Sequence, residues 1–562
     1  MTINMRRKKI RITPGKALMF LFFAWFILAC LVLPNLNLLK TVFFADGNFS
    51  TEPIRKLLKS KRAMKALRNS FILAPTLSIT VGFVGITLVL LTEYFDIKGA
   101  NILRLGYMTT LIYGGITLVS GYKFIYGSSG FLTKLLFQGY GAVLFVMTFS
   151  CTSNHMIFLR NAMRSVDFQT VEAARNMGAG QFYILRRVVL PVLLPSLFAV
   201  TILTFITGLS AMSAPMLVGG TEFQTINPMI KTFADTVSSK DLAALLSLVL
   251  GFATMLLLFI MTQIEKRGHY MSVSKVKTKI VKQKITNPVL NVLAHVYAYV
   301  LFVIYVLPVV LIVLFSFTDS KSIGTRTLTL SSFTLENYKY LLQSLSNYRP
   351  FVVSIVYSAL AAVIVGVIVV VACRYIQKHK KARSASVLEY SLMIPWLLPT
   401  TMIALGLMMA FNVRRPYMFN QVLTGTMVIL LIGYVIIKLP FTMRMTKAAF
   451  FSLDDALEDA SKNLGAGEMY TFRRVIFPVI LPTVMAIAAL NFNALISDYD
   501  MSAFLYHPLN PTLGVQIKSL TNDMNNPNGM ALTFVYAVLM MIISAVVLYL
   551  VYGRGGRDNM KE

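Results

Sequence analysis

The sequence predicts an all-α integral membrane protein with about twelve transmembrane helices, arranged as two tandem halves of six. Three observations support this fold class. The chain has 562 residues, of which 56% are hydrophobic and 14% charged, and its mean hydropathy of +0.68 exceeds what a soluble core needs. Apolar runs of about 20 residues recur, each long enough for a helix to cross a hydrocarbon layer of about 30 Å. One polar segment occurs twice, once in each half.

The candidate spans alternate with short polar connections. Three cysteines lie within or beside these spans and far apart in sequence, so neither a disulfide framework nor a cysteine metal cluster is indicated, and the sequence identifies no other metal site. We expect membrane helices at about 17–37, 71–94, 104–125, 134–157, 190–214, 241–264, 290–317, 351–374, 387–411, 421–443, 479–503 and 531–552.

The basic residues indicate an orientation in the membrane. The formal net charge of +30 lies mainly in short segments between apolar runs, which argues against nucleic acid as a partner. Basic segments at 5–11, 265–284 and 374–383 fall on one side of a twelve-span chain, so the positive-inside rule predicts that both termini are cytoplasmic. The basic segment at 55–68 then lies outside, either as an amphipathic helix on the outer leaflet or as a partner-docking surface.

The polar segment is an internal repeat. Sliding residues 165–197 by 287 positions onto 452–484 aligns SVDFQTVEAARNMGAGQFYILRRVVLPVLLPSL with SLDDALEDASKNLGAGEMYTFRRVIFPVILPTV, with 15 identities in 33 positions. The shared residues include polar ones that shared hydrophobicity would not produce. We therefore predict a first half at 1–265, a basic cytoplasmic linker at 266–288 and a second half at 289–562, with the polar loops at about 160–191 and 447–478.

Each copy predicts a cytoplasmic elbow of two short helices. Asp167 and Asp454 suit the N-cap of the first helix, and Gly178 and Gly465 suit its left-handed end. A second short helix should follow, with paired arginines in its last turn, where the helix dipole favours cations. A proline should then begin the next span, at a position that tolerates a missing N–H. These arginines and prolines are Arg186, Arg187 and Pro191 in the first copy and Arg473, Arg474 and Pro478 in the second.

The spacing of the first copy resembles the EAA motif of permease subunits from binding-protein-dependent ABC importers. Three residues separate Glu172-Ala173-Ala174 from Gly178, and nine more precede Val188-Val189-Leu190-Pro191, which departs from the motif only by Val188 in place of isoleucine. The second copy is looser. It has Asp459-Ala460-Ser461 and Phe477, but it keeps Gly465 and Pro478.

This resemblance implies partners. In that family the elbow, called the coupling helix, sits in a groove of a separate ATP-hydrolysing subunit. The expected partners are two copies of a cytoplasmic ABC ATPase, an extracytoplasmic substrate-binding protein or lipoprotein, and the lipid bilayer of a bacterial cell membrane. The chain contains no GxxxxGK[ST] loop, so it should bind no cofactor itself, and ATP and Mg would be used by the partner. It also lacks the HExxH, repeated CxxC and nucleophile-elbow motifs of an enzyme.

The resemblance extends to fused permeases of the ferric-iron type. It rests on FTLENYKYLL at 333–342, IPWLLPTTMIALGLMMAF at 394–411 and PMLVGG at 215–220. Ferric iron is the implied substrate, with thiamine, phosphonate and polyamine as alternatives. A secondary transporter driven by an ion gradient is the rival class, but both elbows follow an even number of spans, so the repeats are parallel rather than inverted.

Polar residues near the end of the eleventh span mark a candidate translocation path, because polar groups inside a membrane usually face a partner or a pathway. Two carboxylates two residues apart on an intact helix lie about 200° apart and cannot face the same pore. We therefore favour Asp498 over Asp500, unless the helix is broken there. An equally weighted interpretation places both at a solvated outer helix end. The path candidates are Asn491, Asn493, Ser497 and Asp498, with Ser210 and Ser213 in the first half.

Overall fold

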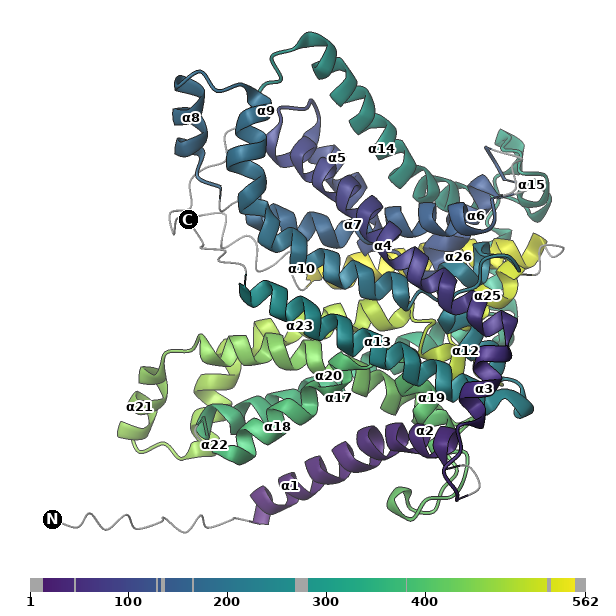
Figure 1. Cartoon of the computed structure of the whole chain (residues 1–562), viewed down its shortest axis with the longest axis vertical. Coiled ribbons are helices and arrows are strands. Elements are labelled where there is room, and N and C mark those ends of the chain that lie inside the picture. The colour runs from purple at the N-terminus through teal and green to yellow at the C-terminus, as the bar shows by residue number, and fades with distance from the viewer. Residues whose placement is uncertain are drawn as a thin grey trace.

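The computed structural model describes residues 14–44, 47–127, 130–132, 137–163, 166–267, 282–380, 382–522 and 527–550. Within these ranges, 10 helices are long and apolar enough to cross a membrane, and two further helix pairs pass the same test together but are sharply bent. The prediction of an all-α membrane protein is confirmed. Figure 1 shows these helices as one bundle, with α8 and α21 at the same end of it.

Six spans lie in each half, in matching order. The first six are α1–η1–α2 (Pro14–Phe26, Ile27–Val32 and Leu33–Phe43), α4–η2 (Lys61–Val89 and Leu90–Tyr94), α5 with α6 (Ala100–Tyr107 and Gly115–Tyr126), α7 (Tyr140–Met163), α9–η4–α10 (Gln181–Ile184, Leu185–Val189 and Leu190–Leu209) and α13 (Lys240–Arg267). The second six are α14 (Pro288–Ser316), α17 (Leu345–Lys378), α18 with α19 (Arg383–Met393 and Thr400–Ala410), α20 (Met427–Phe451), α22–η9–α23 (Glu468–Thr471, Phe472–Ile476 and Phe477–Ile496) and α26 (Pro527–Leu548).

The third span of each half is bent, which corrects our expectation of continuous helices at 104–125 and 387–411. The helix axis is bent by 113° in the first half and by 102° in the second. In the first half the chain is extended at Gly114 and has a φ of +56° at Gly115, which stops the helix. In the second half Pro399 is the N-cap of α19, and the residue before a proline disfavours helical geometry.

The bent pair of the first half nevertheless crosses the bundle once. The backbone N–H of Lys98, just before α5, donates to His295 Nε2 near the start of α14, at 3.2 Å. At the other end of α14, the ring centroid of Phe315 lies 4.9 Å from that of Phe124 in α6. The pair therefore spans the length of α14. Counting each pair as one crossing gives the twelve predicted spans.

The first span of each half packs against the other half. The span α1–η1–α2 contacts α19, and Trp25 Nε1 donates to the carbonyl of Tyr417 at 2.9 Å. In the reverse direction, α14 contacts α5 and α6. The halves are therefore interlocked. The proposed division at 266–288 stays a prediction, since residues 268–281 lie outside the described part.

The basic segment at 55–68 forms α3 (Glu52–Lys59) and the start of α4, and ion pairs hold it to the bundle. Lys56 Nζ lies 3.1 Å from Asp241 at the start of α13, and Lys65 Nζ lies 2.9 Å from Glu222. Exposed pairs of this kind contribute about 0–1 kcal/mol each. These ion pairs therefore add little stability, but they fix the position of the segment at the end of the bundle opposite the elbows.

Candidate coupling elbows and translocation path

The first elbow begins with α8 (Phe168–Asn176), capped as the sequence predicts. The Asp167 carboxylate accepts from the backbone N–H of Gln169 at 3.0 Å and from the Thr170 hydroxyl at 3.1 Å. The helix ends at Gly178, whose φ is +83°. The N–H of Gly178 donates to the carbonyl three residues earlier, and the next N–H donates to the carbonyl five residues earlier, at 2.9 and 3.0 Å. This is a Schellman cap.

The second elbow repeats this geometry in α21 (Asp455–Asn463). The Asp454 carboxylate accepts from the N–H of Ala456 at 2.9 Å, and Gly465 has a φ of +78°. The N–H groups of Gly465 and Ala466 close the same cap, at 2.9 and 3.1 Å. Asp454 and Gly465 stand 287 positions after Asp167 and Gly178, so the local chemistry of the repeat produces the same turn twice.

The second half of each elbow corrects our prediction of a separate short helix. The segments α9, η4 and α10 form one span, Gln181–Leu209, and the second copy forms one span, Glu468–Ile496. The paired arginines lie in a π-helical turn inside each continuous helix, so the helix-dipole argument does not apply to them. A π turn directly before a proline accommodates its missing N–H, which explains why Pro191 and Pro478 do not break the helix.

The motif residues are almost all exposed. Ala174 is buried at 8% exposure, and the exposed ones are Glu172, Ala173, Gly178, Arg186, Arg187, Pro191, Asp459, Ala460, Gly465, Arg473, Arg474 and Pro478. Each elbow also exposes three large apolar side chains at matched repeat positions. They are Met177, Phe182 and Tyr183 in the first elbow and Leu464, Met469 and Tyr470 in the second, each at least 60% exposed. Paired apolar surfaces of this kind are typical of interaction sites.

The first elbow is attached to the linker. Gln181 donates through Nε2 to the carbonyl of Lys284 and accepts through Oε1 from the N–H of Thr286 at 3.3 Å. Arg175 donates to the side chain of Gln283, which is 4% exposed. The backbone of Gln283 in turn pairs with the end of the second span, donating to Tyr94 at 2.8 Å. This segment, residues 282–286, leads directly into α14.

The second elbow is attached to α17 by ion pairs instead. Arg374 Nη1 lies 2.9 Å from Glu458, and Lys378 Nζ lies 2.8 Å from Glu468. Glu468 stands 287 positions after Gln181, so one repeat position makes a neutral attachment in one half and a charged one in the other. Arg374, with a smaller contribution from Lys462, lowers the pKa of the Glu458 carboxyl by hydrogen bonding and by charge.

The candidate path lies where α10 and α23 end. The two helices stop at Leu209 and Ile496, earlier than the predicted spans, with Ser210 and Ser497 as their half-buried C-caps. Beyond them, Ser213 Oγ donates to Asp500 Oδ1 at 3.4 Å. These two residues are 287 positions apart, so they are repeat equivalents in direct contact. A contact between equivalent positions lies on the axis that relates the two halves.

Because α23 ends at Ile496, the rotation argument against two carboxylates on one helix does not apply. The Asp498 carboxylate accepts from the backbone N–H of Ser502, the first residue of the short helix α24 (Ser502–Leu505), at 3.0 Å. Asp498 also interacts electrostatically with Asp500 and with Lys438 in the middle of α20. Lys438 is not among the path residues predicted from the sequence. A lysine within an apolar span was the signal available for finding it.

Asn491 and Asn493 lie one to two turns before this end of α23. Asn491 is 2% exposed, and its side-chain amide donates to the Thr442 hydroxyl of α20 at 2.8 Å. The amide of Asn493 donates to the carbonyl of Ser544 in α26 at 3.4 Å, and its Oδ1 is buried without a partner. Both side chains therefore join helices. Their contact with a substrate stays a prediction. Among the described residues, no group of three or more His, Cys, Asp or Glu side chains could hold a metal ion.

The fold and the elbows define a polytopic membrane protein with a repeated, exposed elbow in each half, both at one end of the bundle. Comparison with known proteins names its class. The family model "Binding-protein-dependent transport system inner membrane component" matches residues 362–553. The "Probable ABC transporter permease protein y4fN" of Sinorhizobium fredii is 37% identical, over 93% of this chain and 94% of the relative. The chain therefore belongs to the ABC transporter permeases.

Two more distant relatives carry substrate names. The "Ferric transport system permease protein FbpB" of Actinobacillus pleuropneumoniae is 22% identical, over 92% of this chain and 75% of its own length. The "Putative 2-aminoethylphosphonate transport system permease protein PhnV" of Salmonella typhimurium is 27% identical, over 27% of this chain and 55% of its own length.

Proposed function

We propose that this permease is the membrane subunit of an ATP-driven importer that takes its substrate from an extracytoplasmic binding protein. Two copies of a cytoplasmic ABC ATPase would hydrolyse ATP with Mg, each holding one elbow. The exposed apolar triplets at matched positions of the two elbows support this assignment. The proposed cellular location is a bacterial cell membrane, with the elbows and both chain ends on the cytoplasmic side.

The continuous helices explain how an elbow would move the path. The span from Gln181 to Leu209 has 29 residues, and at 1.5 Å per residue it is about 44 Å long. One end carries Phe182 and Tyr183 of the exposed triplet, and the other end lies directly before Ser210. A displacement of the elbow therefore moves the end of the path without an intervening hinge. Different contacts with the two states of the ATPase would bias access toward one side or the other.

The ATPase partnership is tested by breaking both caps. Proline cannot adopt the positive φ of Gly178 and Gly465, so the double change to proline should abolish copurification of the ATPase while leaving the membrane bundle folded. Gly180→Ala with Gly467→Ala is the matched control, because both glycines have φ near −70° and open space at the Cβ position. Normal copurification of the double proline variant would refute the assignment.

We propose ferric iron as the substrate. The supporting observation is Asp500 in contact with its repeat equivalent Ser213, with Asp498 beside it. Carboxylate and hydroxyl oxygens are the donors that a hard cation prefers. The ferric permease relative, matched over 92% of this chain, favours the same substrate. Thiamine and polyamines are cations too, so carboxylates alone do not separate them from iron.

Lys438 favours a second candidate, 2-aminoethylphosphonate. This substrate carries an amine and a phosphonate, and a neighbouring carboxylate and ammonium would complement both charges. Asp498 and Lys438 supply that pair. The phosphonate permease relative supports this candidate over only 27% of the chain.

Competitive uptake separates these candidates. In cells that depend on this gene, ferric iron should compete with labelled ferric uptake, and Asp500→Asn should reduce the rate while Lys438→Gln leaves it within about twofold. Competition by 2-aminoethylphosphonate, with Lys438→Gln the damaging change, would replace iron by the phosphonate. A defect confined to thiamine would exclude both. Loss of uptake in vesicles that retain ATP but no proton gradient would favour an ion-coupled transporter instead.

A further inference from the structure

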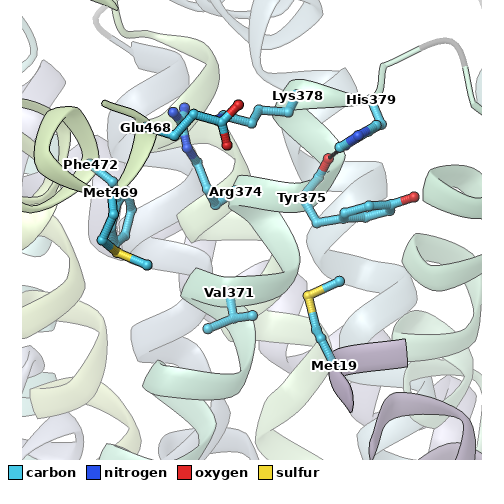
Figure 2. Close-up of a pocket in the computed structure, with 9 residues that line it drawn as sticks. All are labelled: Met19, Val371, Arg374, Tyr375, Lys378, His379, Glu468, Met469 and Phe472. Atoms are coloured by element: carbon cyan, nitrogen blue, oxygen red, sulfur yellow. Dashed lines mark hydrogen bonds and ion pairs between the residues drawn. The ribbon is translucent and has the colours of Figure 1, made fainter. Parts of the chain in front are cut away.

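A cavity of about 280 Å³ opens at the elbow end of the second half, away from the repeat axis. Figure 2 shows that three elements line it: α1 of the first span, the last turns of α17, and α22 with η9 at the start of the span that follows the second elbow. It therefore joins a swapped span from one half to the other half's elbow. Its lining residues are Met19, Val371, Arg374, Tyr375, Lys378, His379, Glu468, Met469 and Phe472.

The lining is divided by chemistry. Met19, Val371 and Phe472 form an apolar part, whereas the charged groups of Arg374, Lys378 and Glu468 gather at the other side (Figure 2). Arg374 is 12% exposed and donates through Nη1 to Glu458, but its Nη2 is buried without a hydrogen-bond partner. An arginine holds five N–H donors in a planar fork suited to a phosphate. The buried Nη2 is the side of that fork that has no acceptor.

An apolar stripe on α17 leads to the cavity from the membrane. The exposed positions follow helical spacing of three or four residues, and each side chain is at least 41% exposed: Val352, Val356, Leu360, Val363, Val367 and Val371. Such a row on a span faces lipid chains. The stripe continues without a break into Arg374 and Lys378, within the last turns before α17 ends. An apolar surface along a span with cations at its end complements the acyl chain and the phosphate of a phospholipid.

The charge near the cavity favours an anionic lipid. The described lining carries two cations, Arg374 and Lys378, and one carboxylate, Glu468. Lys378 is paired with Glu468, whose side chain is 71% exposed. A lipid phosphate that reached Lys378 would compete with this carboxylate.

We propose that this cavity binds an anionic phospholipid from the leaflet on the elbow side, with its phosphate between Arg374 and Lys378 and one acyl chain along the stripe of α17. The bound lipid touches Met469 and Phe472 of the second elbow and Met19 of the first span. The lipid phosphate therefore takes the place of the Lys378–Glu468 ion pair between α17 and the second elbow, and the acyl chain adds contact with the first span. At the equivalent position of the first elbow, Gln181 makes neutral hydrogen bonds to Lys284 and Thr286 instead of an ion pair.

Native mass spectrometry of the purified full-length permease tests this site, with dioleoylphosphatidylglycerol and dioleoylphosphatidylcholine titrated separately in detergent. Phosphatidylglycerol should bind at least fivefold tighter. A single basic side chain near a lipid phosphate changes affinity by about fivefold, so Lys378→Gln should weaken phosphatidylglycerol binding by about that factor. Arg160→Gln is the matched control, because Arg160 is also ion-paired to a glutamate near a span end but does not line the cavity.

Two further variants make the result independent of folding. Glu468→Gln removes the competing carboxylate and should tighten phosphatidylglycerol binding, an effect that damage to the fold does not produce. Val371→Trp fills the apolar part and should weaken binding with no change of charge. Equal affinity for the two lipids, equal losses in Lys378→Gln and Arg160→Gln, or displacement of the lipid by millimolar inorganic phosphate would overturn the proposal.

Discussion

Replacing Gly178 with alanine isolates the contribution of one backbone conformation to the first elbow. At a φ of +83° an L-residue is less stable than glycine by about 1–2 kcal/mol. A Cβ at this position meets no atom within 4 Å, so no steric clash adds to that cost. Alanine also reduces the entropy of the unfolded chain, which returns about 0.4–1 kcal/mol. The net loss is about 1 kcal/mol, a factor of about five in the local opening equilibrium.

Hydrogen–deuterium exchange measures this opening directly. The amides of residues 178 and 179 close the cap of α8, so a peptide covering them should exchange about fivefold faster in Gly178→Ala. Gly180→Ala provides a control with the opposite sign, since its φ of −67° suits alanine and its Cβ position is also open. That variant should exchange at the same rate or more slowly. Equal acceleration in both variants would refute the assignment of the effect to the left-handed conformation.

Three further predictions concern the attachments of the elbows and the helix interface. Arg374→Gln should lower the free energy of unfolding at pH 7 by about 1 kcal/mol. Because Arg374 lowers the pKa of Glu458, the pair stabilises the fold above the ordinary glutamate pKa of about 4.3, and this stabilisation is lost as pH falls through the lowered pKa. The melting temperatures of wild type and variant should therefore converge in acid. A pH-independent difference would contradict this. Raising the salt concentration should accelerate amide exchange in α21 more than in α8, because ion pairs among the described residues hold the second elbow and not the first. Equal acceleration would refute that distinction. A double-mutant cycle of Asn491→Ala and Thr442→Val should show a coupling of about 0.6 kcal/mol in thermal stability, and strict additivity would show that their hydrogen bond contributes nothing.

The local features of the elbows could be predicted from the sequence because nearby residues produce them. An aspartate N-cap and a glycine eleven positions later define one short helix, and the structure places both as expected in each copy. The helix after the glycine could not be placed correctly, because an arginine pair followed by a proline resembles an ending. A π turn lets the helix continue past Pro191 and Pro478, and no local signal in the sequence marks it.

The differences between the elbows depend on residues far away in the chain. Gln283 lies 108 residues from Arg175, and Arg374 lies 84 residues from Glu458. The repeat aligns Gln181 with Glu468 but contains no information about which segment each side chain meets. The bends of the third spans have local causes at Gly115 and Pro399, but their neighbours are distant in the chain: α14 contacts α5 and α6, and α2 contacts α19.

By itself, the sequence determined that this chain is an all-α membrane protein with two elbows of matching local geometry, because apolar run length and turn chemistry act over a few residues. Tertiary structure alone decided that each first span packs against the opposite half, that Ser213 meets its equivalent Asp500, and that one elbow is held by hydrogen bonds and the other by ion pairs. These features require contacts between distant segments, and the free energy of such contacts depends on packing that a linear pattern does not record.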